Sequence, residues 1–409
     1  MSNQHKDTTQ QRLSRRGVVA GGLAAGSVAA TGAVVWQHRQ ETKGIEQEPL
    51  ESIGTEQETF YGEHQAGLLG DPQAYGNFIS FDLKANVKEI SKVRSMMKIL
   101  TDDAARLMKG ENALADMEPE LARIPASLTL TFGFGPSFFE KLNIENRKPA
   151  WLKVLPIFKQ DQLDQAQSNG DFMVSICAND AVTVAHATRI ISKDARSFCT
   201  VRWEQQGFRN AAGTVPKGQT TRNLFGQLDG SRNPTEKDEN FNEVMWSQGS
   251  GDKAWITGGT SFVYRKIKMD LEGWDQIDRG AREIVIGRNL DNGAPLTGTK
   301  ESDVPDLDKR DSNGLLIIPE YAHIRRAQTD DSTQRMVRRP YNYDSLQEGS
   351  GLIFNAYQAD PDHQFIPIQR RLDELDLLNK WVTPVASAIF AIPPGCQEGG
   401  YIGEGILGS

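Results

Sequence analysis

The sequence has 409 residues, of which 38% are hydrophobic and 24% charged, and its formal net charge is −8. This composition is typical of a soluble globular protein, and the length allows one large domain or two ordinary ones with a sizeable core. The acidic balance excludes a general role in nucleic-acid binding, because the phosphate backbone requires a basic surface.

The first 36 residues have the pattern of an export signal. A polar, basic start ends in Arg15-Arg16, and an uncharged stretch rich in glycine and alanine follows from Gly17 to Trp36. The paired arginines indicate the twin-arginine route, which would leave the protein periplasmic, at the cell surface or extracellular. A single membrane anchor is the alternative, although we expect no stable membrane span once the signal is removed. Residues 37–55 are polar and predict a linker, with the folded body beginning near Phe60.

Strand and helix patterns alternate through the first part of the body. Strands are predicted where apolar residues alternate or run together, at 77–85, 128–134 and 172–177. Helices are predicted where apolar residues recur at helical spacing, at 87–108, 136–142 and 181–191. Cys177 lies in one of the apolar runs, so we interpret it as a buried core residue, with a disulfide to Cys199 as the alternative.

The second part of the chain repeats this order. Strands are predicted at 260–269 and 352–357, an amphipathic helix at 271–286, and a further helix from Gln369 after a proline-interrupted stretch. Matching strands are offset by about 180 residues, which predicts a duplicated α+β unit. The simplest such unit is the βαββαβ ferredoxin-like fold. We therefore predict two ferredoxin-like halves, 56–215 and 216–409, with a long surface excursion at 288–319.

One short segment and one histidine are candidates for chemistry. Gly226-Gln227-Leu228-Asp229-Gly230 brackets a single acid between two glycines, a pattern that by itself indicates only a tight turn. His323 is followed closely by Arg325 and Arg326, but a lone histidine is more often structural than a metal ligand. We interpret His186 as structural because it falls within a predicted helix, whereas His64 and His363 lie in polar turns.

Several segments, in order along the chain, together resemble the dye-decolourising peroxidase family. The G-x-x-D-G motif of Gly226 to Gly230 is the signature of that family. The others are TFGFGPSFF (131–139), ICANDAVTVAHATR (176–189), IGRNLDNGAPLTG (286–298), HIRR (323–326), VRRPYNYD (337–344), AYQADPDHQFIPIQRRL (356–372) and AIFAIPPG (388–395). The resemblance runs from about residue 56 to the end and is strongest to exported members, which include deferrochelatase-type proteins.

The resemblance implies one haem b per chain, bound in the C-terminal half. The family pattern makes His323 the proximal ligand of the haem iron, Asp229 the distal acid and Arg338 the distal arginine. Gly230, Ser231 and Arg232 would touch the haem edge. The chain departs from the family in the middle of the motif, where Gln227-Leu228 replaces an aromatic residue that relatives often have.

These groups suit the reduction of hydrogen peroxide. An ionised Asp229 can take a proton from one peroxide oxygen and return it to the other, and Arg338 can stabilise the charge that develops as the O–O bond breaks. The expected partners are hydrogen peroxide and an organic reductant such as a dye or phenol, and haem- or iron-uptake proteins are further candidates. Bulky reductants could deliver electrons through surface aromatic residues, for which the candidates are Tyr341, Tyr343, Trp246 and Trp381.

Two other functions stay open at the level of the sequence. A deferrochelatase would release iron from haem and leave the porphyrin intact. A non-catalytic haem carrier would need neither Asp229 nor Arg338, so the presence of both residues favours an enzyme.

Overall fold

The computed structural model describes residues 50–216 and 219–408, so the expected export signal lies outside the described residues. Helix α1 (Leu50–Thr55) occupies the end of the stretch that we expected to be a linker. The carbonyl of Gly54 accepts a hydrogen bond from the backbone N–H of Ala126, 3.1 Å away. The folded body therefore begins before Phe60, because this short helix is tied to the domain by backbone contacts that polarity alone does not reveal.

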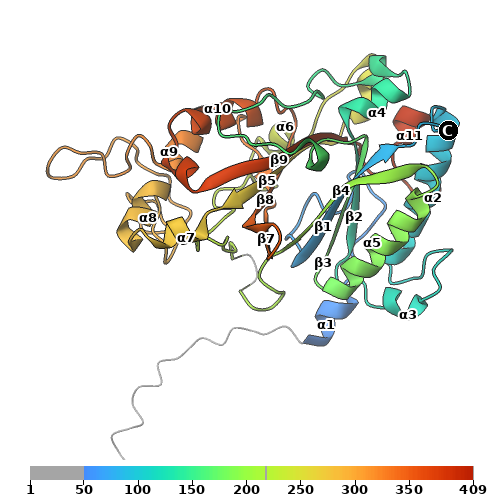
Figure 1. Ribbon diagram of the computed structural model, residues 1–409, viewed down its shortest axis with the longest axis horizontal. Helices are drawn as coiled ribbons and strands as arrows, with labels where there is room; N and C mark the ends of the chain where they lie inside the picture. Colours follow the sequence, from blue (N-terminus) through green and yellow to red (C-terminus); the bar gives the residue numbers. More distant parts are fainter. Residues whose placement is uncertain (1–49, 217–218, 409) are drawn as a thin grey trace, which may run out of the picture. The chain divides into compact units, whose positions relative to one another are not determined.

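The first half is a ferredoxin-like βαββαβ unit (Figure 1). Its main elements are β1 (Tyr75–Leu83), α2 (Ile90–Met108), β2 (Thr129–Phe134), β3 (Phe172–Ala178), α5 (Ala181–Ala195) and β4 (Cys199–Phe208). The strands lie in the order β2-β3-β1-β4, and each pairs antiparallel with its neighbour. This is the strand order expected when two βαβ units interleave, and α2 and α5 pack side by side on one face of the sheet.

The second half repeats the same arrangement. Its main elements are β5 (Thr260–Met269), β6 (Val337–Arg338), β7 (Tyr341–Ser345), β8 (Gly349–Gln358), α10 (Phe365–Leu375) and β9 (Val382–Ile392). Strand β5 lies between β9 and β8, and both β6 and β7 pair with β8. The duplication predicted from the strand spacing is confirmed, because β1 and β5 are the first strands of their units and β3 and β8 the third.

The two sheets join at their edges into one continuous ring of strands. Phe134 of β2 pairs with Ala391 of β9, and Phe208 of β4 pairs with Asn342 of β7. Alternate residues along each strand then point into or out of the ring. Phe78, for example, packs with side chains from both halves, whereas Ile79 packs in the cluster that contains α2 and α5. Large side chains buried in this way each stabilise the fold by roughly 1.5–3 kcal/mol.

Two helices differ from the sequence-based expectation. The helix predicted at 271–286 is divided into α7 (Leu271–Asp275) and α8 (Arg279–Ile286). The division arises because the Asp278 side chain accepts a hydrogen bond from the N–H of Ala281 and thereby caps a new helix. Helix α10 begins at Phe365 rather than Gln369, since Pro367 lies in the first turn, where no N–H is needed. Strands β4, β6, β7 and β9 were not predicted.

The remaining elements are short. They are α3 (Pro119–Ala122), α4 (Pro136–Lys141), α6 (Phe241–Met245), α9 (His323–Ala327), α11 (Glu404–Leu407) and the 3-10 turns η1 (Glu145–Arg147), η2 (Gln165–Gln167), η3 (Gly251–Ile256) and η4 (Leu377–Lys380). The excursion at 288–319 contains no helix or strand, as predicted. Cys177, Cys199 and Cys396 are all buried and free, so no disulfide links Cys177 to Cys199. Among the described helices, none combines the length and apolar character needed to cross a membrane.

Candidate active site

His323 is the first residue of the short helix α9, which follows the long excursion. The side chain of Arg325 fastens this helix by donating from Nε to the carbonyl of Ile318, 3.0 Å away. Ile324 packs against the cluster that contains Trp274 and Val285. The side chain of His323 is 33% exposed, so part of the imidazole ring is accessible.

A buried carboxylate holds one edge of the ring. Nδ1 of His323 donates to Oδ2 of Asp376, 2.6 Å away, and the Asp376 side chain is only 3% exposed. The second oxygen of Asp376 accepts a hydrogen bond from the N–H of Leu378 at the start of η4. Burial lowers the pKa of His323, but the charge and hydrogen bond of Asp376 outweigh burial and raise the pKa above its usual value. Asp376 therefore sets the ring orientation and tautomer, which leaves Nε2 as the free nitrogen.

Asp229 and Arg338 form a second charged pair in the same region. Asp229 lies on the segment between β4 and β5, and Arg338 lies on β6, where it pairs with Ala356 of β8. Nη1 of Arg338 is 3.9 Å from Oδ1 of Asp229, and both side chains are largely buried. The charges of both residues act on the pKa of His323, Asp229 raising it and Arg338 lowering it. The fold thus brings together the three residues that the resemblance singled out, although they are far apart in the sequence.

The segment that follows Asp229 is bound to the long excursion. Ser231 donates from its hydroxyl to Glu301, 2.7 Å away, and its carbonyl accepts a hydrogen bond from Nη2 of Arg338. Gly230 and Arg232 both have positive φ, 125° and 60°, a conformation that costs the arginine backbone free energy. The predicted edge residues therefore lie in a tight turn, next to Arg338.

A buried arginine that the sequence did not single out supports this turn. Arg288 donates from Nη1 to the carbonyls of Gly293 and Glu301. Burial lowers the pKa of Arg288 to about 10, and the charges of Arg338 and Arg232 add to that effect. Arg288 still carries its charge at neutral pH, so cations gather on this side of the site.

The three other histidines within the described residues have structural surroundings. His186 is buried against Asp116, with 3.1 Å between Nε2 and Oδ2, as expected for a structural residue. The ring of His64 stacks on Trp246 with 3.5 Å between centroids, and His363 contacts Thr333 at the surface.

The expectation of surface aromatic residues was wrong for three of the four candidates. Tyr341, Tyr343 and Trp246 are buried in the cluster inside the ring, and only Trp381 is partly exposed. The sequence did not reveal this because the burial arises from pairing between the two halves.

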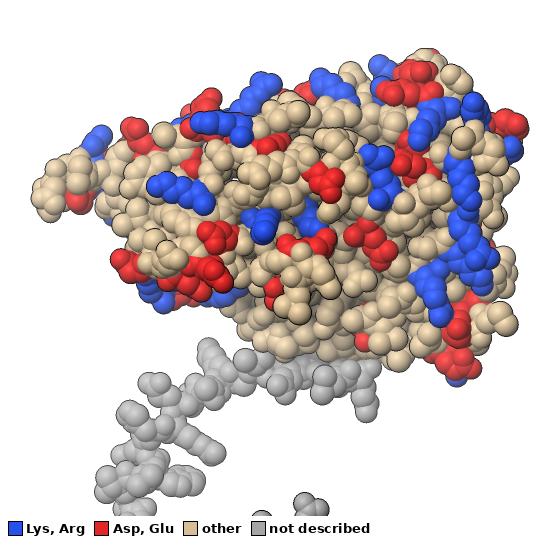
Figure 2. Space-filling model, viewed as in Figure 1, with Lys and Arg blue, Asp and Glu red and all other residues tan. Residues whose placement is uncertain are grey.

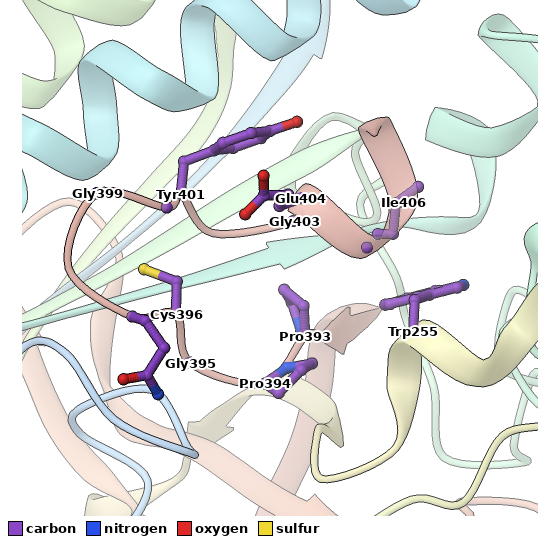
Figure 3. Close-up of a pocket in the computed structure, with 13 residues that line it drawn as sticks. Trp255, Pro393, Pro394, Gly395, Cys396, Gly399, Tyr401, Gly403, Glu404 and Ile406 are labelled. Atoms are coloured by element: carbon purple, nitrogen blue, oxygen red, sulfur yellow. The ribbon is translucent and has the colours of Figure 1, made fainter. Parts of the chain in front are cut away.

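A pocket of about 490 Å³ lies elsewhere, between the C-terminal segment and η3 (Figure 3). Trp255, Cys396, Tyr401 and Glu404 line it, together with several glycines and prolines. Burial raises the pKa of Cys396 to about 11, so its thiol stays protonated and is a poor nucleophile at neutral pH. None of the predicted site residues lines this pocket, and we assign it no role in the reaction.

On the face drawn in Figure 2, the charged side chains form no single acidic patch. Figure 2 shows acidic and basic side chains interspersed over the viewed face, with a run of lysines and arginines at its right-hand edge. The net negative charge is therefore distributed rather than gathered into one acidic patch on this face.

Comparison with known proteins is consistent across the whole body. The family model "Dyp-type peroxidase, N-terminal" matches residues 65–209, and "Dyp-type peroxidase, C-terminal" matches residues 220–397. A dye-decolorizing peroxidase of Thermobifida fusca is 34% identical over 98% of this chain and 99% of its own. A deferrochelatase of Yersinia pestis is 34% identical over 96% of this chain and 95% of its own.

Solved structures show the same relationship. A DyP-type peroxidase from Cellulomonas bogoriensis is 43% identical, with a TM-score of 0.83 over 87% of this chain and 99% of that one. Ferric DtpA from Streptomyces lividans is 39% identical, with a TM-score of 0.84 over 88% of this chain and 100% of that one.

These matches define the class of protein as a haem-dependent oxidoreductase. The chain belongs to the Dyp-type peroxidase family, and it is a haem peroxidase that uses hydrogen peroxide and a reductant. The donor set of the site fits haem, because Nε2 of His323 has no hydrogen-bond partner among the described residues and its imidazole is backed by a carboxylate.

Proposed function

We propose that haem binds in the C-terminal half, where His323 would bind the iron and Asp229 and Arg338 would act on the peroxide. The observation that carries this proposal is the 2.6 Å contact between His323 and the buried Asp376. Ligating histidines in metalloproteins commonly donate their second ring nitrogen to a carboxylate, which raises the basicity of the ligand. Gly230, Ser231 and Arg232 would contact the haem edge, and Arg338 would add a cation there.

Haem, when bound, supplies the redox-active iron that reduces hydrogen peroxide. The protein then has to move one proton and stabilise one developing charge. Asp229, when ionised, would take a proton from one peroxide oxygen and return it to the other, which leaves as water. Arg338 stabilises negative charge on the departing oxygen through its guanidinium. Neither step requires a second histidine.

The test of the ligand is replacement of His323. His323→Ala should lose haem or hold it weakly, with an altered Soret band, because no other described histidine shares its surroundings. His363→Ala is the matched control, since His363 lies at the surface and its loss should leave haem content unchanged. Normal haem content and an unchanged spectrum in His323→Ala would remove the ligand assignment.

The reductant is proposed to be a dye, a phenol or another organic molecule. The match to a relative named as a dye-decolorizing peroxidase supports this substrate class. Steady-state assays with a dye and with simple phenols, each with and without peroxide, test it. Failure to oxidise any of them in haem-loaded protein would refute this choice of reductant.

A second candidate function is the release of iron from haem, which would connect the protein to haem- or iron-uptake partners. It is favoured by the similarity to relatives named as deferrochelatases. Incubating the protein with haem and recording the fluorescence of metal-free porphyrin separates the two functions. Fluorescence that grows with time would support iron release, whereas a constant background would oppose it.

We also propose that the chain is exported by the twin-arginine route. The support is the sequence pattern at Arg15-Arg16 and the uncharged stretch that follows. This route carries folded proteins, so it suits a protein that acquires its cofactor before export. Replacing both arginines with lysine should leave folded, haem-loaded protein inside the cell, and continued export would point to another route.

A further inference from the structure

The hydrogen bonds around Asp229 and Arg338 leave one atom of each side chain unengaged. Oδ2 of Asp229 accepts a hydrogen bond from Nδ2 of Asn223, 3.2 Å away. Nε of Arg338 donates to Oδ1 of Asn233, also at 3.2 Å, and Nη2 donates to the carbonyl of Ser231. Oδ1 of Asp229 and Nη1 of Arg338 make no hydrogen bond to any part of the chain that the structure describes.

These two atoms face each other across 3.9 Å. That separation is longer than a hydrogen bond, although opposite charges this close would ordinarily gain free energy by closing to a direct contact. We infer that Asn223 and Asn233 are positioning residues that hold Asp229 and Arg338 apart, so that Oδ1 and Nη1 stay available to the peroxide. This inference rests on the proposed roles of Asp229 and Arg338.

Asn233 is well placed to restrain Arg338 because its side-chain amide forms hydrogen bonds with both the backbone and the side chain of that residue. Its Oδ1 also accepts a hydrogen bond from the backbone N–H of Arg338 at 3.2 Å, and its Nδ2 donates to the Arg338 carbonyl at 2.6 Å. The amide of Asn233 thus binds the backbone N–H, the backbone carbonyl and Nε of Arg338. These contacts fix the position of Nε relative to the backbone. The guanidinium can then reach Asp229 only by breaking a hydrogen bond.

Asn223 restrains the carboxylate from a turn that is itself well anchored. Its Oδ1 accepts hydrogen bonds from the backbone N–H groups of Phe225 and Gln227, at 3.1 and 3.3 Å. Phe225 in turn packs on the buried Trp274, with 4.6 Å between ring centroids. The amide group of Asn223 is therefore oriented with Nδ2 toward Asp229.

Other charged groups also lie close enough to interact with Asp229. Arg209 interacts electrostatically with Asp229, and its side chain is bound to Thr221 Oγ1 and to the Pro340 carbonyl. His323 interacts with Asp229 from α9. These partners are unchanged in the variants below, so a shift in pH dependence reports on the asparagines.

The experiment measures cyanide binding to the ferric, haem-loaded protein as a function of pH, with the Soret band as the readout. Hydrogen cyanide must give up its proton to bind as the anion, so the affinity for cyanide should fall at acidic pH as Asp229 becomes protonated. This fall is the acid limb of the pH profile. In Asn223→Asp a second carboxylate replaces the amide donor, and this acid limb should move to higher pH by about 1 unit or more. Asn223→Ala should shift the acid limb in the same direction but by a smaller amount. It replaces Asn223→Asp as the test if the aspartate variant does not fold.

Asn233→Ala should give the opposite shift. The released guanidinium can close on Asp229, which stabilises the carboxylate and moves the acid limb to lower pH while lowering the affinity at every pH. Asn292→Asp is the matched control, because Asn292 also caps a turn through Oδ1 and donates through Nδ2 but contacts neither residue. Its limb should coincide with that of the wild type.

Two results would overturn the inference in different ways. If the Asn223 and Asn233 variants weaken cyanide binding without moving the acid limb, the asparagines have a structural role only. Asp229→Asn, measured in parallel, tests the proposed function itself. If Asp229→Asn also keeps the wild-type limb, the assignment of Asp229 as proton acceptor is wrong, and the inference falls with it.

Discussion

Nδ1 of His323 lies 2.6 Å from Oδ2 of Asp376, although 53 residues separate them in the chain. The N–H of Leu377 donates to the carbonyl of Tyr321, so a backbone hydrogen bond also joins the two segments beside the side-chain contact. If His323 binds the haem iron as proposed, this contact would make the imidazole a strongly donating ligand, because the carboxylate attracts its Nδ1 proton.

Replacing Asp376 should therefore change the electronic properties of bound haem. Asp376→Asn keeps a side-chain oxygen near Nδ1 but removes the charge, so the imidazole should donate less strongly to the iron. We expect a more positive midpoint potential and a haem affinity lower by about 10–100-fold. Spectroelectrochemistry and haem titration measure the two effects. Asp373→Asn is a suitable control, since Asp373 caps the backbone at Lys159 and Gln160 instead. An unchanged potential in Asp376→Asn would show that Asp376 only orients the ring.

Replacing Asp229 should abolish the acid limb of the reaction with peroxide. Asparagine cannot take up the proton, so the rate of the first oxidation step should fall by about 10²–10⁴ and lose its dependence on acidic pH. Stopped-flow mixing of ferric protein with peroxide, over a range of pH, measures this. If the variant keeps both the wild-type rate and the wild-type acid limb, Asp229 does not carry the proton, and water or Arg338 must do so.

Replacing Arg338 should lower the same rate at every pH. Arg338→Leu removes the charge that stabilises the departing oxygen, and the loss should be about 10²–10³ by analogy with oxyanion donors. Arg335→Leu is the control, because Arg335 is bound to Asp238 and the carbonyl of Arg232 rather than to Asp229. Equal rates in the two variants would contradict a specific role for Arg338.

A buried carboxyl pair outside the site should make stability depend on pH. Burial and the neighbouring charge of Asp103, to which it is hydrogen-bonded, raise the pKa of Asp194 from 3.8 to about 7. The folded state then holds this proton more tightly than the unfolded chain does. The free energy of unfolding should therefore fall as pH rises from the unfolded value to about 7.

Asp194→Asn should flatten this dependence, because the amide can keep a hydrogen bond to Asp103 without ionising. Urea unfolding at mildly acidic and mildly alkaline pH, in wild type and variant, gives the comparison. Asp71→Asn, at an exposed position, should retain the wild-type slope. A variant whose stability declines as steeply as that of the wild type would show that Asp194 is not the titrating group.

The glycine that ends α8 should be irreplaceable because of its contact with the helix that carries His323. Gly287 has φ of 88°, and a Cβ there would lie 2.7 Å from Cγ1 of Ile324. Gly287→Ala should combine about 1–2 kcal/mol of backbone strain with about 1–3 kcal/mol from overpacking. Gly314→Ala has a similar φ of 80° but open space around the Cβ, so it should show the strain alone. Unfolding and the Soret band are the measurements, and equal losses in both variants would rule out the contact with Ile324.

Local patterns in the sequence were sufficient for most secondary structure and for the duplicated fold. Apolar runs such as 172–177 marked buried strands, and helical spacing marked α2 and α5, because these periods follow from backbone geometry. The division between α7 and α8 was missed because it depends on one capping side chain, Asp278, rather than on periodicity. Strand β4, exposed at alternate positions along one face, carried too little apolar signal to be recognised.

The sequence by itself also determined the family, through ordered segments that include G-x-x-D-G and HIRR, and with it the candidates His323, Asp229 and Arg338. Only the tertiary structure decided the partners that give these residues their chemistry. The sequence did not single out Asp376, Asn223 or Asn233, because hydrogen bonding at 2.6–3.2 Å depends on how distant segments pack. Periodicity reports which face of an element is buried, whereas the charge state and orientation of a site depend on contacts between elements, which one-dimensional spacing does not contain.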